Sequence, residues 1–338
     1  MRYSCAIPLC AVFSALAAGE PSTVLLLSTR AGWVEAVNPA TLATIARIPT
    51  PQNTESVASS ADGARLFVAA PKEPRGPCCA IFAIDKGSME QTPFEWPAPL
   101  VVVAGNRILA QRGNVGIDVF DAQTLERLPG IATHSHYELK ASPSGRSVFG
   151  ITHTPELALD LFNLVSGQRV VSHVFTPGAI LAGTYVGNDY YLFAVEEGEA
   201  RIHHVRSDTG QFEERVVSMP ASLFPKCDGA PYEAVAVADK IAIYEQFGMQ
   251  GGQNCEMPGG YLLADPGDRS ASQRLAPELH FSQLVGAGGY LYGLEAGDGS
   301  WRHVRLVKLD PVSGKPVAER TLDAAVWYLT GGSFAGAN

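Results

Sequence analysis

The sequence predicts an all-β fold, a seven-bladed β-propeller of four-stranded antiparallel blades that is closed by pairing of its N- and C-terminal segments. Three observations predict it. A short strand-and-turn unit recurs seven times along the 338 residues. The spacing of the units matches the length of a four-stranded blade. No window longer than about ten residues keeps a 3.6-residue apolar period without Gly, Pro or a β-branched run, so helices are not expected.

The repeated unit is an apolar or alternating strand that ends in a turn of the form Asp/Asn-x-x-(Ser/Thr)-Gly/Leu. The seven units begin at positions 33, 81, 117, 159, 202, 261 and 304, and neighbouring starts lie 36 to 59 residues apart. These intervals bracket the roughly 40–50 residues of a propeller blade. The two longest intervals contain cysteines, and we expect insertions there.

The remaining strands are predicted around each unit. A run such as 24–28 or 190–194 precedes a unit and predicts the second strand, and a run such as 43–48 or 169–175 follows it and predicts the outermost strand. The innermost strand leads into a tight turn, as at 60–63, 142–145, 186–188 and 287–289, where Gly or Asn supplies the positive φ that hairpins use. Each blade needs its neighbours to cover its two faces, so burial favours a ring.

The two ends of the chain predict how the ring closes. The first strand, at Val24, has the character of a second strand, and residues 325–330 have the character of an innermost strand with no complete unit after it. We therefore expect the two ends to share one blade, which would hide both exposed edges.

Several segments carry a family resemblance: SADGARLFVA (60–69), WVEAVNPATLATIARIP (33–49), SPSGRSVFG (142–150) and LDLFNLVSGQRVVSHV (159–174). They resemble the YVTN-repeat propellers of the superfamily that includes lactonases and quinoprotein amine dehydrogenase β-chain-like proteins. The resemblance covers nearly the whole chain after the N-terminal segment, and it implies the seven-bladed fold. It implies no single activity, because that superfamily mixes enzymes, surface proteins and members without known activity.

The N-terminal segment has the three parts of an export signal. Arg2 precedes an apolar stretch over 5–16, and small residues follow at 15–18. We predict a signal peptide over 1–18, a single propeller domain over 19–338, and a periplasmic or extracellular location. The stretch is shorter than the roughly 20 apolar residues of a membrane span, and a lipoprotein is disfavoured because Cys10 follows the bulky Leu9.

Four cysteines remain after residue 18, and an oxidising compartment favours disulfides among them. The most economical pairing joins Cys227 to Cys255. Cys78 and Cys79 are neighbours, which leaves either a strained vicinal disulfide or two thiols.

The charge balance restricts the partners. The formal net charge is −9, and no run of Lys or Arg could neutralise a row of phosphates, so nucleic acid is not an expected partner. No transmembrane segment is predicted. We expect a protein partner or a small-molecule ligand, and a monomer, because nothing in the sequence demands an oligomer.

Candidate ligand-binding residues lie in the loops that lead into the seven innermost strands, which face the axis of a propeller. Carboxylates and imidazoles that converge there would bind a divalent metal or bind and protonate a polar substrate. The alternative is ordinary solvated loop residues, and packing between blades for the aromatic ones. No metal or cofactor is assigned. The candidates are Glu55, His136, Tyr137, Glu138, Tyr232, Glu233, His280 and Trp327.

No catalytic motif accompanies these residues. The sequence has no Gly-x-Ser-x-Gly elbow, His-Glu-x-x-His motif or calcium loop, and His203 and His204 lie inside a predicted strand, where they point to opposite faces. We therefore predict an exported binding scaffold. The alternative is an enzyme that uses the Glu/His residues, either a lactonase-like hydrolase or, less favoured, a quinoprotein-like oxidoreductase with its cofactor near Cys78 and Cys79.

Overall fold

The computed structural model describes residues 22–73, 80–85, 91–94, 101–112, 116–133, 138–152, 156–176, 179–196, 199–220, 223, 232–246, 259–296, 304–322 and 326–334. Within these ranges the regular structure is β, apart from a 3₁₀ turn at Leu223. The described part of the chain has no helix of the length and hydropathy that a membrane span requires. The predicted signal peptide and all four later cysteines lie outside the described residues, so both predictions stay open.

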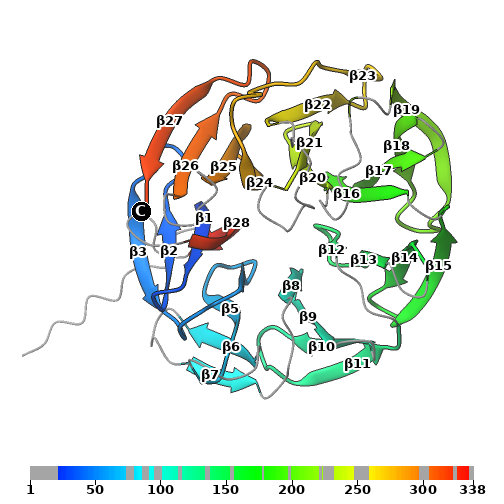
Figure 1. Cartoon of the computed structure of the whole chain (residues 1–338). Helices are drawn as coiled ribbons and strands as arrows, with labels where there is room; N and C mark the ends of the chain where they lie inside the picture. The colour runs from blue at the N-terminus through cyan, green and yellow to red at the C-terminus, as the bar shows by residue number, and fades with distance from the viewer. Residues whose placement is uncertain are drawn as a thin grey trace, which may run out of the picture.

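Seven four-stranded antiparallel sheets form a ring around a central axis (Figure 1). We number these sheets as blades in chain order and give the strands of each from the axis outward. Blade 1 contains β28 (Val326–Phe334), β1 (Ser22–Thr29), β2 (Trp33–Val37) and β3 (Thr44–Pro49). Blade 2 contains β4 (Ser56–Ser59), β5 (Arg65–Ala70), β6 (Ala80–Asp85) and β7 (Gln91–Phe94). Blade 3 contains β8 (Val101–Ala104), β9 (Arg107–Arg112), β10 (Gly116–Asp121) and β11 (Arg127–Ile131).

The other four blades repeat this order. Blade 4 contains β12 (Glu138–Ala141), β13 (Ser147–Thr152), β14 (Ala158–Asn163) and β15 (Gln168–Val174). Blade 5 contains β16 (Ile180–Val186), β17 (Asp189–Glu196), β18 (Glu199–Val205) and β19 (Phe212–Pro220). Blade 6 contains β20 (Tyr232–Val237), β21 (Lys240–Glu245), β22 (Tyr261–Asp265) and β23 (Ser270–Ala271). Blade 7 contains β24 (Phe281–Ala287), β25 (Tyr290–Ala296), β26 (Val304–Leu309) and β27 (Pro316–Thr321).

The seven repeated units are the third strands of the seven blades, which confirms the predicted architecture. Their turns close as the sequence pattern requires. In blade 4, Asn163 Oδ1 accepts hydrogen bonds from the backbone N–H groups of Val165 and Ser166 at 2.8 and 3.0 Å, and Gly167 then adopts φ +69°. Blades 1 and 3 place Leu42 and Leu125 in this left-handed conformation, where a side chain costs about 1–2 kcal/mol.

Apolar clusters between neighbouring blades form the core. Each of the seven clusters draws buried side chains from two adjacent blades. The cluster that joins blade 7 to blade 1 contains Leu25 and Leu27 from β1 together with Tyr292 and Leu294 from β25, all at most 1% exposed. Burial of such side chains stabilises the ring by roughly 1.5–3 kcal/mol each.

Closure follows the prediction from the chain ends. The C-terminal strand β28 pairs antiparallel with β1 from Ser22↔Phe334 to Thr29↔Val326, and Figure 1 shows the two strands side by side in blade 1. The first and last described strands therefore share one sheet, and neither edge between them is left unpaired.

Hairpins between third and fourth strands carry pairs of polar or charged side chains at a spacing of nine residues. Asp118 and Arg127 are joined at 2.6 Å in blade 3, and Asp160 and Arg169 lie 3.8 Å apart in blade 4. In blade 5, His204 Nδ1 lies 2.7 Å from a Glu213 carboxylate oxygen. His204 also stacks on Tyr191, so its ring is held by contacts within blade 5.

Candidate functional site at the propeller axis

The innermost strand of blade 4 brings two opposite charges to the axis. On β12, Glu138 and Lys140 share one face because side chains alternate along a strand, while Leu139 between them packs into the core against blade 3. Lys140 Nζ lies 3.5 Å from Glu138 Oε1, and the side chains are 33% and 11% exposed. The pair is largely surrounded by protein, so its charges are weakly screened.

Blade 6 contributes a second carboxylate. Glu233 on β20 accepts a hydrogen bond of 2.9 Å from the Tyr244 hydroxyl on the neighbouring strand β21. The same hydroxyl accepts a hydrogen bond of 3.0 Å from the backbone N–H of Leu284 in blade 7. Tyr244 therefore fixes the Glu233 carboxylate and ties blade 6 to blade 7.

Ionisable groups from blades 4, 6 and 1 act on one another, although no two of these blades are adjacent in the ring (Figure 1). Glu233 raises the pKa of both Glu138 and Lys140, and Tyr328 of β28 also raises that of Lys140. Groups on innermost strands of separate blades can approach one another only across the axis. We call Glu138, Lys140, Glu233, Tyr244 and Tyr328 the axial cluster.

Burial and charge set the protonation of this cluster. Burial raises the pKa of Glu138 to about 7. The positive charge of Lys140 opposes this rise, and the negative charge of Glu233 adds to it. Burial alone would lower the pKa of Lys140, but the two carboxylates outweigh it and raise that pKa. Lys140 therefore stays charged at neutral pH, whereas the Glu138 carboxyl is partly protonated and partly ionised at that pH.

Blade 5 supplies a backbone donor to the cluster. The N–H of Gly183 on β16 forms a hydrogen bond with the Glu138 carboxylate, which favours its ionised form. A Cβ at position 183 would lie 1.7 Å from the Tyr190 hydroxyl, and the Tyr190 ring is buried and stacks on Phe149 at 3.9 Å. Glycine is therefore required where the strand passes between this ring and Glu138.

The structure places the other predicted site residues differently. Glu55 precedes β4 and is half-buried, which raises its pKa, but among the described residues it forms no side-chain bond with the axial cluster. Tyr232 is 2% exposed and packs near Phe193 between blades 5 and 6, as the packing alternative expects. His280 directly precedes β24 and is half-buried. His136, Tyr137 and the side chain of Trp327 lie outside the described residues, as do Cys78, Cys79, Cys227 and Cys255.

Sequence reasoning missed three members of the axial cluster. Lys140, Tyr244 and Tyr328 lie inside strands, whereas the repeat pattern points to the loops that lead into the innermost strands. The alternation of β12 contained a usable signal, because a charged residue two positions after Glu138 must lie on the same face. Tyr244 carried no such signal, since its contact with Glu233 depends on the register of β20 with β21.

The axial cluster presents groups that can contact a small polar ligand. Within the described residues, no three His, Cys, Asp or Glu side chains are placed to hold a metal ion. The axial cluster offers two carboxylates and two phenol groups to hydrogen-bond donors or cations, and one ammonium to hydrogen-bond acceptors. A carboxyl group that titrates near pH 7 is also suited to general acid–base chemistry.

Comparison with known proteins establishes the fold alone. No protein-family model matches the chain, and no curated protein matches its sequence. Among solved structures, Kuenenia stuttgartiensis hydrazine synthase matches 86% of this chain and 93% of its own, at 14% identity and a TM-score of 0.61. The β-propeller domain of Cps50 (Swd1) from Myceliophteria thermophila matches 83% of this chain and 95% of its own, at 11% identity and a TM-score of 0.61.

A third structure resembles the chain over 95% of its length. It is the dihydro-heme d1 dehydrogenase NirN, 78% of which is covered at 14% identity and a TM-score of 0.56. These names include two enzymes and one β-propeller domain that is not named as an enzyme, so the shared fold does not distinguish binding from catalysis. The resemblance to YVTN-repeat propellers stays a prediction, because no comparison identifies that family.

Proposed function

We propose that the protein is an exported ligand-binding scaffold whose axial cluster binds a small organic cation such as a primary amine. The observation that carries the proposal is the meeting of Glu138, Lys140 and Glu233 from two separate blades at the axis. The ring is a rigid frame, because every blade packs against both of its neighbours through apolar clusters. Ligand groups held by such a frame lose little further entropy on binding.

The charge balance selects a cation. Two carboxylates face one lysine ammonium, so the cluster becomes net negative when Glu138 ionises. An amine near Glu138 would stabilise the ionised carboxylate and expel its proton at neutral pH. The two tyrosines add polar contacts, although Tyr244 already uses its proton on Glu233.

Calorimetric titration with ethanolamine, 1,4-diaminobutane and the matched neutral alcohols tests the proposal. We expect amines to bind and alcohols not to bind, with proton release detected as a heat that depends on the ionisation enthalpy of the buffer. Glu138→Gln and Glu233→Gln should each weaken amine binding at least tenfold, whereas Glu126→Gln, at an exposed turn, should not. Equal binding by all variants, or no amine binding, would contradict the proposal.

A second candidate, a lactonase-like hydrolase, is favoured by the pKa of about 7 for Glu138. In that function Glu138 would act as general base toward water and then as general acid toward the leaving alkoxide. We expect ring opening of a simple lactone with a pH dependence that inflects near 7 and is lost in Glu138→Gln. If the protein binds amines but does not hydrolyse lactones, the scaffold proposal stands and the hydrolase proposal is contradicted.

Export rests on residues 1–18 of the sequence. Expression of the full chain in a bacterium with a periplasm should give a mature protein that begins near Ala18 or Gly19, as measured by intact mass. Recovery of the uncleaved chain from the cytoplasm would contradict export without affecting the axial cluster.

A further inference from the structure

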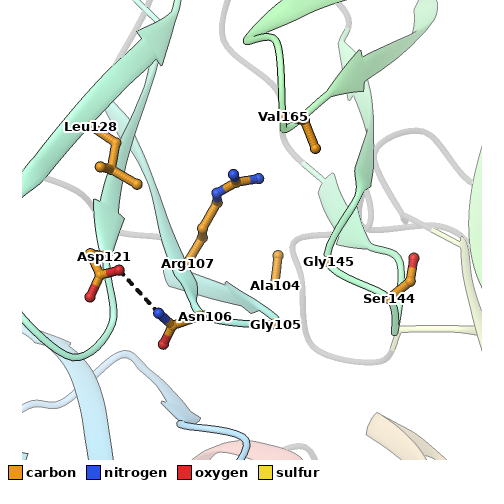
Figure 2. Close-up of a pocket in the computed structure, with 9 residues that line it drawn as sticks. All are labelled: Ala104, Gly105, Asn106, Arg107, Asp121, Leu128, Ser144, Gly145 and Val165. Atoms are coloured by element: carbon orange, nitrogen blue, oxygen red, sulfur yellow. Dashed lines mark hydrogen bonds between the residues drawn. The ribbon is translucent and has the colours of Figure 1, made fainter.

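A cleft of about 320 Å³ lies between blades 3 and 4, on the face of the ring where the turns before the second strands lie. It is separate from the axial cluster. Arg107, the first residue of β9, points into it between Leu128 of blade 3 and Val165 of blade 4 (Figure 2). A volume of this size lies at the lower end of small-molecule sites.

The Arg107 guanidinium forms no hydrogen bond or ion pair with the described residues. Its positive charge lowers the pKa of the nearby Asp121. That carboxylate is already occupied: Oδ1 accepts from the backbone N–H groups of Gln123 and Thr124, both at 2.8 Å, and Oδ2 accepts from Asn106 Nδ2 at 3.0 Å. The guanidinium therefore keeps its donors for a ligand.

The corresponding arginine of blade 2 shows what a structural role looks like. Arg65 begins β5 as Arg107 begins β9, and its guanidinium donates to the carbonyls of Ala122 and Gln123 in the next blade at 3.0 and 2.8 Å. The equivalent turn of blade 4 contains Leu164 and Val165, and Arg107 bonds to neither carbonyl. The cleft occupies the place of that contact.

The walls determine the kind of anion. Leu128 is half-buried, and Val165 is 71% exposed at the rim, so the cleft suits an aliphatic group next to the charge. A single guanidinium matches a carboxylate with two parallel hydrogen bonds. Asp121 repels a second negative charge, which disfavours a phosphate dianion.

We propose that this cleft binds a carboxylate on a short aliphatic stem, with the carboxylate on Arg107 and the stem between Leu128 and Val165. The carboxylate belongs to a free aliphatic acid or to a glutamate side chain of a peptide, since both present the same chemistry. Ser144 and Asn106 lie at the edge of the cleft (Figure 2) and add polar contacts.

NMR titration of the isotope-labelled protein with hexanoate, hexanol, inorganic phosphate and the blocked peptide acetyl-Ala-Glu-Ala-amide tests the proposal. We expect hexanoate or the peptide to shift the backbone signals of 104–107 and 144–145 with a millimolar or lower Kd, and hexanol and phosphate to bind at least tenfold more weakly. Arg107→Met should weaken carboxylate binding at least tenfold. Arg146→Met removes the same charge at an exposed neighbouring residue and should leave binding unchanged.

The outcomes separate the alternatives. Binding of the peptide alone, or of hexanoate alone, supports the site and identifies the source of the carboxylate. Equal binding by wild type and Arg107→Met, phosphate as tight as hexanoate, or no binding by either carboxylate would overturn the proposal. Unchanged unfolding midpoints for both variants would show that the loss at Arg107 is not a loss of folding.

Discussion

An arginine occupies the same position of the repeat at two successive junctions, between blades 2 and 3 and between blades 3 and 4. The two arginines make different contacts. At the first junction Arg65 closes onto two carbonyls of the next blade. At the second, Arg107 forms no hydrogen bond with the carbonyls of the next blade, and a cleft lies there instead. The junction around the cleft is still tightly packed, because Gly145 of blade 4 lies against the backbone of Ala104 and Gly105 in blade 3. The difference indicates that packing near the axis holds the ring, which leaves the outer turns free to vary.

The largest effect is expected at that close approach. A Cβ on Gly145 would lie 2.9 Å from the Gly105 nitrogen, at φ +65°, so Gly145→Ala should lower the free energy of unfolding by about 3 kcal/mol through strain and overpacking. Gly187→Ala is the matched control, since Gly187 has φ +60° and open space around it, and it should cost about 1 kcal/mol. Urea denaturation measures both, and equal losses would show that contact at the junction contributes nothing.

Lys140 of the axial cluster is a third cation, and unlike the two arginines it has two carboxylate neighbours, Glu138 and Glu233. Because the pKa of Glu138 is about 7 in the folded protein and 4.5 by itself, the folded state holds this proton more tightly. The contribution to stability is present below pH 4.5 and is lost as the pH rises to 7. We expect the stability of the wild type relative to Glu138→Gln to fall by about 2–3 kcal/mol over this window in urea denaturation. A difference that does not change with pH would contradict the raised pKa.

The two arginines test the comparison directly. Arg65→Met removes two hydrogen bonds between blades and should cost about 1–2 kcal/mol. Arg107→Met should change the free energy of unfolding by less than about 0.5 kcal/mol, because no hydrogen bond among the described residues is lost. If the two substitutions prove equally costly in denaturant, Arg107 is structural and the distinction between the junctions fails.

A smaller effect is expected where the ring closes. The Tyr292 hydroxyl of blade 7 donates to the Pro39 carbonyl of blade 1 at 2.7 Å, in the same manner as Arg65 at its own junction. Tyr292→Phe keeps the buried ring and should cost about 1 kcal/mol, measured by thermal unfolding. Tyr290→Phe, at a residue 36% exposed on the same strand, is the control and should change little.

The candidate site was predictable only in part. Glu138 and Glu233 could be selected because they are the first and second residues of innermost strands, a position that repeats with the blade. Their partners could not, because the register between β20 and β21 decides that Tyr244 reaches Glu233, and the curvature of the ring decides that Lys140 faces Glu233 across the axis. Tyr232, adjacent to Glu233, had the same signal and is instead buried between blades, since neighbours on a strand point to opposite sides.

Sequence patterns alone are enough to predict the all-β class, the seven blades, their third strands and the closure by the two chain ends. Each of these follows from local patterns, namely strand periodicity and turn residues, repeated often enough to count. The folded ring sets which charges meet at the axis and which of two equivalent arginines bonds to the carbonyls of the next blade. Those outcomes depend on distances between blades, which are set by close contacts such as Gly145 against Gly105 and by burial, and no local pattern contains them.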